Sequence, residues 1–241
     1  MKAAVLIAHY DKNAQLRNTL AGIARQVTTF PFEVCIIDDH SKVDPVSIVE
    51  EQLWGKSSMM SYKYKRLEKN VGGQFSHGMC MDLVSDDVDV IVVMSCDVVM
   101  VGTNIIEELC KRVKGKQVVT AEVHDIPIPE DMYKNFEAHI ERSMKMWDGA
   151  RTYSNPIRMY MFLSAVRRDY LEMSGYCELN CDYITHIQFE RMGMKHYIYQ
   201  DLKAIHQHHK NLEYTCSIQK DCEYPCMKNR GKRRYRMEHP K

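Results

Sequence analysis

The sequence lacks the features that mark a secreted or membrane-spanning protein. None of its apolar runs approaches the roughly 18–20 residues that a bilayer-spanning helix needs. The first apolar run, Ala3 to Ala8, is far shorter than the apolar region of a secretory signal peptide. The nine cysteines, scattered over predicted strands and helices, therefore indicate reduced thiols rather than a disulfide framework. We expect a cytoplasmic location.

Glycine-rich phosphate loops are also missing. No Gly-x-Gly-x-x-Gly pattern follows the first predicted strand, and no complete Gly-x-x-x-x-Gly-Lys-Ser or Gly-x-x-x-x-Gly-Lys-Thr loop occurs in the 241 residues. These absences argue against a dinucleotide-binding fold and against a P-loop nucleotide hydrolase. The length fits one large α/β domain or two small ones.

The chain does have a regular alternation of short apolar segments with segments of helical spacing. Strands are predicted at residues 2–8, 32–37, 61–67, 88–94, 117–123 and 159–166, and helices at 13–26, 73–84, 104–113, 131–147 and 183–192. This alternation predicts right-handed βαβ units and an α/β fold with a mostly parallel sheet flanked by helices. The strand at 61–67 alternates in polarity, and we expect it at an edge of the sheet.

Polar clusters follow three of the predicted strands. They are His9-Tyr10-Asp11, Asp38-Asp39-His40-Ser41 and Ser95-Cys96-Asp97. Ligands of open parallel sheets bind outside the carboxyl ends of the strands, so this half of the chain is predicted to bind a nucleotide. Without a glycine-rich loop, the charge of a diphosphate is met most economically by a divalent cation. The carboxylate of Asp97 is a hard ligand that suits Mg²⁺ or Mn²⁺; alternatively, Asp97 merely ends its strand or caps the next helix.

A second informative segment runs from Asp182 to His206. Asp182 begins a predicted amphipathic helix that Gly193 closes, and His206 lies where the following strand ends. An acid and an imidazole at element ends on one side of a sheet suit a general base and a metal ligand. The alternative for Asp182 is an N-cap of the helix, and one carboxylate could serve both purposes.

An ordered set of motifs carries a resemblance to a known family. The set is Ala8-His9-Tyr10-Asp11, Ile37-Asp38-Asp39-His40-Ser41, Asn70-Val71-Gly72, Ser95-Cys96-Asp97, Gly175-Tyr176, Cys181-Asp182 and His206. In order and spacing it resembles family 2 of the glycosyltransferases, with the GT-A fold, over roughly residues 3–209. Rhamnosyltransferase-like members look similar. The domain is expected at 1–210, with a nucleotide-sugar half at 1–123, an acceptor and catalytic half at 124–210, and a basic extension at 211–241.

The resemblance implies roles for the matching residues. The implied donor-binding residues are Ala8, Tyr10, Asp11, Asp38, Asp39, Gly72, His77, Ser95 and Cys96. Asp39, with Asp38 beside it, matches the carboxylates that bind the base of a nucleotide-sugar, with a UDP-sugar favoured. Asp97 and His206 match ligands of the divalent cation, Mg²⁺ or Mn²⁺. Asp182 matches the general base, whose action inverts the anomeric configuration.

The sequence also departs from the family pattern. Ser95 replaces the first acid of Asp-x-Asp, and Cys181 stands where glutamate is usual. His77 lies where the family often has an arginine, and Asp11 where it usually has asparagine. The Gln-x-x-Arg-Trp motif of processive synthases is absent. We therefore do not expect a polymerising enzyme.

The acceptor is predicted from the C-terminal segment. Residues 227–241 hold seven of the 33 basic residues and one of the 32 acids. The residues that could track a phosphate backbone are Lys228, Arg230, Lys232, Arg233, Arg234 and Arg236. Family analogy implies a glycan or lipid-linked saccharide, whereas this basic segment favours a hydroxymethylated base in DNA. The sequence leaves both acceptors open, and a solvated tail is the plainer interpretation.

Two further alternatives follow from the residues. His206, His208, His209, Cys216, Cys222 and Cys226 offer six metal ligands, although the cysteine spacing is not that of a structural zinc site. Because Ser95 and Cys181 break two acidic pairs, the chain could instead be a non-catalytic nucleotide-sugar-binding module. A nucleotidyltransferase is a third possibility, against which the missing glycine-rich motif argues.

Overall fold

The computed structural model describes residues 1–149, 151–152, 162–176 and 182–207. Within these ranges nine strands form one sheet, in the order β3-β2-β1-β4-β8-β6-β9-β5, with β7 paired to β6. The strands are β1 (Ala3–His9), β2 (Phe32–Asp38), β3 (Met60–Arg66), β4 (Val90–Ser95), β5 (Val98–Val101), β6 (Gln117–Ile126), β7 (Arg151–Thr152), β8 (Leu163–Arg167) and β9 (Lys195–Gln207). The α-helices are α1 (Asn13–Ala24), α2 (Val46–Leu53), α3 (Gly73–Met79), α4 (Ile105–Arg112), α5 (Phe136–Met144), α6 (Arg168–Met173) and α8 (Asp182–Arg191), and the 3-10 helices are η1 (Cys80–Leu83), η2 (Met132–Asn135) and η3 (Trp147–Gly149).

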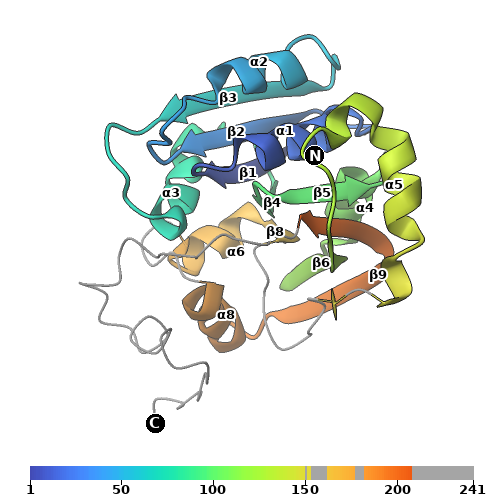
Figure 1. The fold of residues 1–241 in the computed structure, drawn as a ribbon. Helices are drawn as coiled ribbons and strands as arrows, with labels where there is room; N and C mark the ends of the chain where they lie inside the picture. The colour runs from blue at the N-terminus through green and yellow to red at the C-terminus, as the bar shows by residue number, and fades with distance from the viewer. Residues whose placement is uncertain (150, 153–161, 177–181, 208–241) are drawn as a thin grey trace, which may run out of the picture.

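The sheet is mostly parallel, as predicted. Strands β3, β2, β1 and β4 pair in parallel, and so do β6 and β9. Strand β8 runs antiparallel between β4 and β6, and β5 runs antiparallel to β9. In Figure 1 the sheet extends from β3 at the top to β6 and β9 in the lower half. The edge position predicted for β3 is confirmed.

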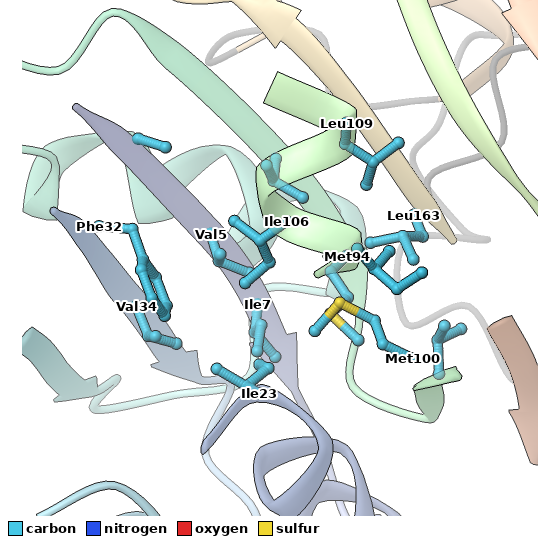
Figure 2. Close-up of a cluster of buried hydrophobic side chains, with 14 of the residues drawn as sticks. Val5, Ile7, Ile23, Phe32, Val34, Met94, Met100, Ile106, Leu109 and Leu163 are labelled. Atoms are coloured by element: carbon cyan, nitrogen blue, oxygen red, sulfur yellow. The ribbon is translucent and has the colours of Figure 1, made fainter. Parts of the chain in front are cut away.

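Helices cover both faces of the sheet because the central strands are apolar on both sides. Val5 and Ile7 of β1 enter a core that also contains residues of α1, α2 and α4. Figure 2 shows Val5 and Ile7 with Ile23 of α1 and with Ile106 and Leu109 of α4. Ala4 and Leu6, the alternate residues of the same strand, enter a second core that includes residues of η1, α6 and α8. With both faces covered, polar side chains of these strands reach a ligand mainly at the strand ends.

The predicted elements are largely confirmed, although the helix predicted at 73–84 is divided into α3 and η1, β7 was not predicted, and further differences occur. The helix expected at 131–147 is broken into η2, α5 and η3, and the strand expected at 159–166 begins at Leu163, with 159–161 outside the described residues. Helix α2 was not predicted, and β5 and α6 were also missed. Among the described residues no helix is long and apolar enough to cross a membrane.

The register of three strands brings distant residues together at the carboxyl edge. In the parallel pairing of β6 with β9, Asp125 lies opposite His206. In the antiparallel pairing of β5 with β9, the same His206 lies opposite Val98, the residue after Asp97. A shift in register between Ala121 and Glu122 lets both halves of the long strand β9 pair with β6. The fold therefore places Asp97, Asp125 and His206 side by side.

Candidate active site

The loop after β1 is fastened to the loop after β2 by three buried polar side chains. His9 Nδ1 lies 2.9 Å from Asp38 Oδ1, and Ser41 Oγ donates to the same oxygen at 2.5 Å. The backbone N–H of Lys12 donates to His9 Nε2 at 3.2 Å, so the ring carries its proton on Nδ1 and donates it to Asp38. Since Ser41 faces Asp38 and Nε2 faces the backbone, the trio is a structural clamp rather than an activated serine.

The adjacent acids Asp38 and Asp39 are fully buried. Asp39 accepts the backbone N–H groups of Val71 and Gly72 at 2.7 and 2.8 Å. Burial raises the pKa of Asp39 above its usual range, although these two amides act in the opposite direction. Asp38 also faces Arg66, whose Nη1 lies 3.3 Å from Asp38 Oδ2. Both acids therefore fix the loops that border the carboxyl edge, and contact of either one with a nucleotide base remains a prediction.

A row of alternating charges lies at the carboxyl edge. Lys12 Nζ lies 2.5 Å from Asp97 Oδ2, and His206 Nε2 lies 3.4 Å from the same oxygen. The other ring nitrogen, His206 Nδ1, lies 2.6 Å from Asp125 Oδ1. The four side chains come from the residue before α1, the β4–β5 turn, β9 and β6. Along this row, cationic and anionic side chains alternate, in the order Lys12, Asp97, His206 and Asp125.

Burial and neighbouring charges together set the protonation of this row. Asp97 is 3% exposed, and burial alone would raise the pKa of its carboxyl group. The hydrogen bond with His206 and the charge of Lys12 outweigh burial and hold that pKa well below its usual range. For His206, burial acts to lower the pKa, but the bonds to Asp125 and Asp97 raise it to about 9. At neutral pH Asp97 is therefore an anion and His206 a cation.

Asp97 and His206 fit a divalent cation whose shell is completed by a bound ligand. Neighbouring ligands on an octahedral ion with bonds of about 2.1 Å lie about 3 Å apart, which is close to the 3.4 Å between Oδ2 and Nε2. The carboxylate of Asp125 holds Nδ1, the usual arrangement behind a metal-binding histidine. Within the described ranges no group of three His, Cys, Asp or Glu side chains could hold a metal. The other ligands would include oxygens of a diphosphate, and His206 Nε2 would have to lose its proton.

The other residues predicted to bind the donor lie at or just after the ends of β1 and β4. Ala8 and Ser95 lie opposite each other in β1 and β4. Tyr10 is exposed, and Asp11 has a positive φ of 51° in the loop that precedes α1. Cys96 is buried, and burial raises the pKa of its thiol to about 12, so it is protonated and unreactive at neutral pH.

His77 is placed differently from the arginine that it replaces. Its Nε2 lies 3.1 Å from the carbonyl oxygen of Met94, and its Nδ1 lies 2.5 Å from the hydroxyl of Tyr176. A carbonyl only accepts, so Nε2 carries the proton and Nδ1 accepts from Tyr176. Burial lowers the pKa of His77 to about 4, which leaves the ring neutral. This geometry favours a packing role over contact with a donor phosphate.

The predicted base and the predicted acceptor residues are less fully described. The backbone of Asp182 begins α8, as predicted, while its side chain lies outside the described part of the structure. Cys181 also lies outside it, and so does the C-terminal segment after Gln207. That segment includes Lys228, Arg230, Lys232, Arg233, Arg234 and Arg236 and the histidines and cysteines considered for zinc.

Two residues of the charged row were missed by the sequence analysis. Lys12 directly follows the polar cluster His9-Tyr10-Asp11, and Asp125 follows the strand predicted at 117–123. Both therefore satisfy the rule that polar residues at strand ends are candidates. What the sequence does not display is the register between β6 and β9 that places Asp125 against His206.

Comparison with solved structures identifies the GT-A fold. A mannosyltransferase from Pyrobaculum calidifontis in complex with GDP-Man and Mn²⁺ is 17% identical, with a TM-score of 0.60 over 87% of this chain and 57% of its own. TarS 1-349 from S. aureus in complex with UDP is 15% identical, with a TM-score of 0.56 over 85% of this chain and 60% of its own. GalNAc-T7 with UDP, GalNAc and Mn²⁺ is 11% identical, with a TM-score of 0.63 over 95% of this chain and 47% of its own. This chain thus spans about half of each of these proteins.

The family follows from the sequence itself. Residues 4–172 match the model of the family described as glycosyl transferase family 2. The chain belongs to that family, which confirms the predicted family, while the rhamnosyltransferase-like subtype stays a prediction. A comparison with curated proteins finds no match.

Proposed function

We propose that this chain transfers a sugar from a nucleotide-sugar donor to an acceptor hydroxyl, with inversion at the anomeric carbon. The observation that carries the proposal is the buried Asp97, held between Lys12 and His206 at the carboxyl edge of a parallel sheet. This is where the diphosphate of a donor would lie in an open α/β sheet. A UDP-sugar is the favoured donor.

Asp97 and His206 would hold Mg²⁺ or Mn²⁺ together with the diphosphate. The metal would supply positive charge that stabilises the departing nucleoside diphosphate. Support comes from the fit of the two ligands and from the Mn²⁺ in two of the similar structures. Asp125 would keep His206 turned with Nε2 toward Asp97. Because position 95 is a serine rather than an acid, the protein itself would supply few ligands to the metal. Metal binding would therefore depend on the donor.

Asp182 is the proposed general base. The acceptor hydroxyl would attack the anomeric carbon as the bond from that carbon to the diphosphate oxygen breaks. Asp182 would take the hydroxyl proton, and the electrons of the broken bond would leave with the nucleoside diphosphate. Attack from the face opposite the leaving group inverts the anomeric centre.

The release of nucleoside diphosphate tests this proposal directly. UDP-, GDP- and dTDP-sugars would be incubated with the protein and Mn²⁺, with glycan and hydroxymethylated DNA acceptors offered separately. Acceptor-dependent release from one donor supports the proposal. Donor binding in calorimetry without release of nucleoside diphosphate would favour a non-catalytic binding module. The replacement of acids by Ser95 and Cys181 is the observation that favours this alternative. If the chain of 241 residues binds none of the donors, the proposal is wrong.

The acceptor is distinguished by salt dependence. A DNA acceptor held by the basic segment predicts that log affinity falls with log salt by about 0.9 per contacted phosphate. Deletion of residues 227–241 should then flatten the slope without changing donor hydrolysis. A saccharide acceptor predicts no such slope. Gel-shift titrations of the 241-residue chain and of the chain without residues 227–241, at two salt concentrations, measure the difference.

A further inference from the structure

Lys12 contacts the carboxylate oxygen that a metal ion would need. Its Nζ contacts Asp97 Oδ2 at 2.5 Å, and this is the same oxygen that faces His206 Nε2 at 3.4 Å. A divalent ion bound to that oxygen at about 2.1 Å would lie less than about 5 Å from the ammonium group. Two cations that close together repel each other strongly in a site with little water. Lys12 and the metal therefore compete for Asp97 unless an anion separates them.

Only the side chain of Lys12 needs to move to resolve this competition. Its backbone N–H is fixed to His9 Nε2 at 3.2 Å, and its carbonyl oxygen accepts the N–H of Leu16 at 2.8 Å in the first turn of α1. The ammonium is carried by a flexible chain of four carbons, and the side chain is 18% exposed. A diphosphate beside Asp97 would lie within reach of this ammonium.

We propose that Lys12 exchanges one anion for another when the donor binds. Before binding, it neutralises the buried Asp97; afterwards, it pairs with the donor diphosphate and leaves Asp97 to the metal. Metal and diphosphate are then bound together, and either one alone is bound weakly. This inference rests on the proposed function, because it requires a nucleoside diphosphate and a divalent ion at the carboxyl edge.

Mn²⁺ and UDP are the probes that test the exchange. Free Mn²⁺ would be measured by electron paramagnetic resonance with and without UDP, and UDP binding by calorimetry with and without Mn²⁺. For the wild-type protein, we expect UDP to raise the affinity for Mn²⁺ by about 10-fold or more, a typical coupling between two ligands. In Lys12→Met, Mn²⁺ alone should bind more tightly than to wild type and UDP more weakly. The coupling should therefore fall, whereas Lys12→Arg should retain most of it.

Lys2→Met is the matched control. Lys2 precedes β1 as Lys12 follows it, and its Nζ lies 3.5 Å from the buried Glu33, at the opposite edge of the sheet. It is 22% exposed at its side chain, close to the value for Lys12. Its removal should leave the affinities for Mn²⁺ and UDP unchanged. A change of both affinities in this control as large as in Lys12→Met would overturn the inference.

The test is decisive because Lys12→Met should raise the affinity for Mn²⁺ and lower the affinity for UDP. If Lys12→Met weakens Mn²⁺ and UDP equally, or changes neither, Lys12 does not exchange partners. If circular dichroism shows that Lys12→Met does not fold, the same affinities are measured on Lys12→Gln. The wild-type protein gives an independent test: if UDP does not change its affinity for Mn²⁺, the inference is wrong. A wild-type protein that binds none of UDP, GDP and dTDP refutes the proposed function as well, whereas binding with unaltered coupling in the variant refutes the role of Lys12 alone.

Discussion

Two buried carboxylates at opposite edges of the sheet are neutralised in different ways. Glu33, near the start of β2, accepts the N–H and the hydroxyl of Ser85, both at 2.7 Å, and has Lys2 and Lys63 at 3.5 Å. Asp97, after the end of β4, is held by the side chains of Lys12 and His206. A backbone amide cannot leave its acceptor without a change of fold, whereas a lysine side chain can. The difference marks Glu33 as a structural acid and Asp97 as one whose partners a ligand can replace.

The pKa values of the two acids are shifted in the same direction. Burial acts to raise the pKa of both carboxyl groups, and in both it is outweighed so that the pKa is lowered. For Glu33 the main lowering groups are the two donors of Ser85, and for Asp97 they are His206 and Lys12. The direction of the pKa shift therefore does not separate a structural acid from a functional one, whereas the groups that cause the shift do.

The largest expected effect comes from removing the charge of each acid in turn. Asp97→Asn should lower kcat/KM by ~10³-fold, because the charge that holds the metal and orders the diphosphate is lost. Glu33→Gln should instead lower the free energy of unfolding by roughly 1–3 kcal/mol, because a buried acceptor set is disturbed, and kcat/KM should stay within a few-fold of wild type. Nucleoside diphosphate release and urea denaturation measure the two quantities. Equal losses of kcat/KM in both variants would remove the distinction between the edges.

A second prediction separates donor binding from the chemical step at the carboxyl edge of the sheet. Asp182→Asn should lower kcat by ~10²-fold or more, the usual loss when a general base is removed. The affinity for UDP should remain that of the wild type, since the proposed role of Asp182 concerns the acceptor proton. Steady-state kinetics and calorimetry on the same preparation check this. Turnover within a few-fold of wild type would assign the proton to another residue.

A third prediction concerns Asp125, which touches His206 from the far side. Asp125→Asn keeps the size of the side chain but removes its charge, so His206 loses the group that turns Nε2 toward Asp97. The affinity for Mn²⁺ in the presence of UDP should fall by ~10-fold, as for other outer partners of metal-binding histidines. Electron paramagnetic resonance of free Mn²⁺ measures it. An Asp201→Asn variant, whose acid pairs with Arg112 on the surface, is the control. If Asp125→Asn binds Mn²⁺ as the wild type does, Asp125 does not position the ring.

The sequence predicts the apolar strands and their polar ends because burial and strand endings are local properties. The clusters after β1, β2 and β4 are visible as short runs of polar residues after apolar ones. By contrast, β5 is a run of four apolar residues immediately after Asp97, too short to be distinguished from a connection. Lys12 was overlooked because its partner is 85 residues away. The site depends on pairings between strands, and a single sequence contains no local trace of these.

The last prediction concerns a buried group whose two hydrogen-bond partners are both neutral. His77 bonds to Met94 and Tyr176, and burial lowers its pKa to about 4 from 6.5. Because the pKa is lower in the folded state, the contribution of His77 to stability is complete above pH 6.5 and is lost as the pH falls toward 4. At pH 4.5, two units below the ordinary pKa of 6.5, the loss should amount to about 2–3 kcal/mol, since one pKa unit corresponds to about 1.4 kcal/mol.

His77→Gln should therefore make the free energy of unfolding less dependent on pH between 7 and 4.5 than it is in the wild type, as measured by urea denaturation across that range. His196 has its pKa lowered to about 4 by burial as well, so His77→Gln/His196→Gln should remove roughly twice the pH dependence. The acids Glu33 and Asp97 titrate mainly below this window because their pKa values are lowered, and the raised pKa of Asp39 contributes equally to the wild type and the variant. If His77→Gln retains the full pH dependence of the wild type, the ring of His77 is not the neutral, buried group that its hydrogen bonds indicate.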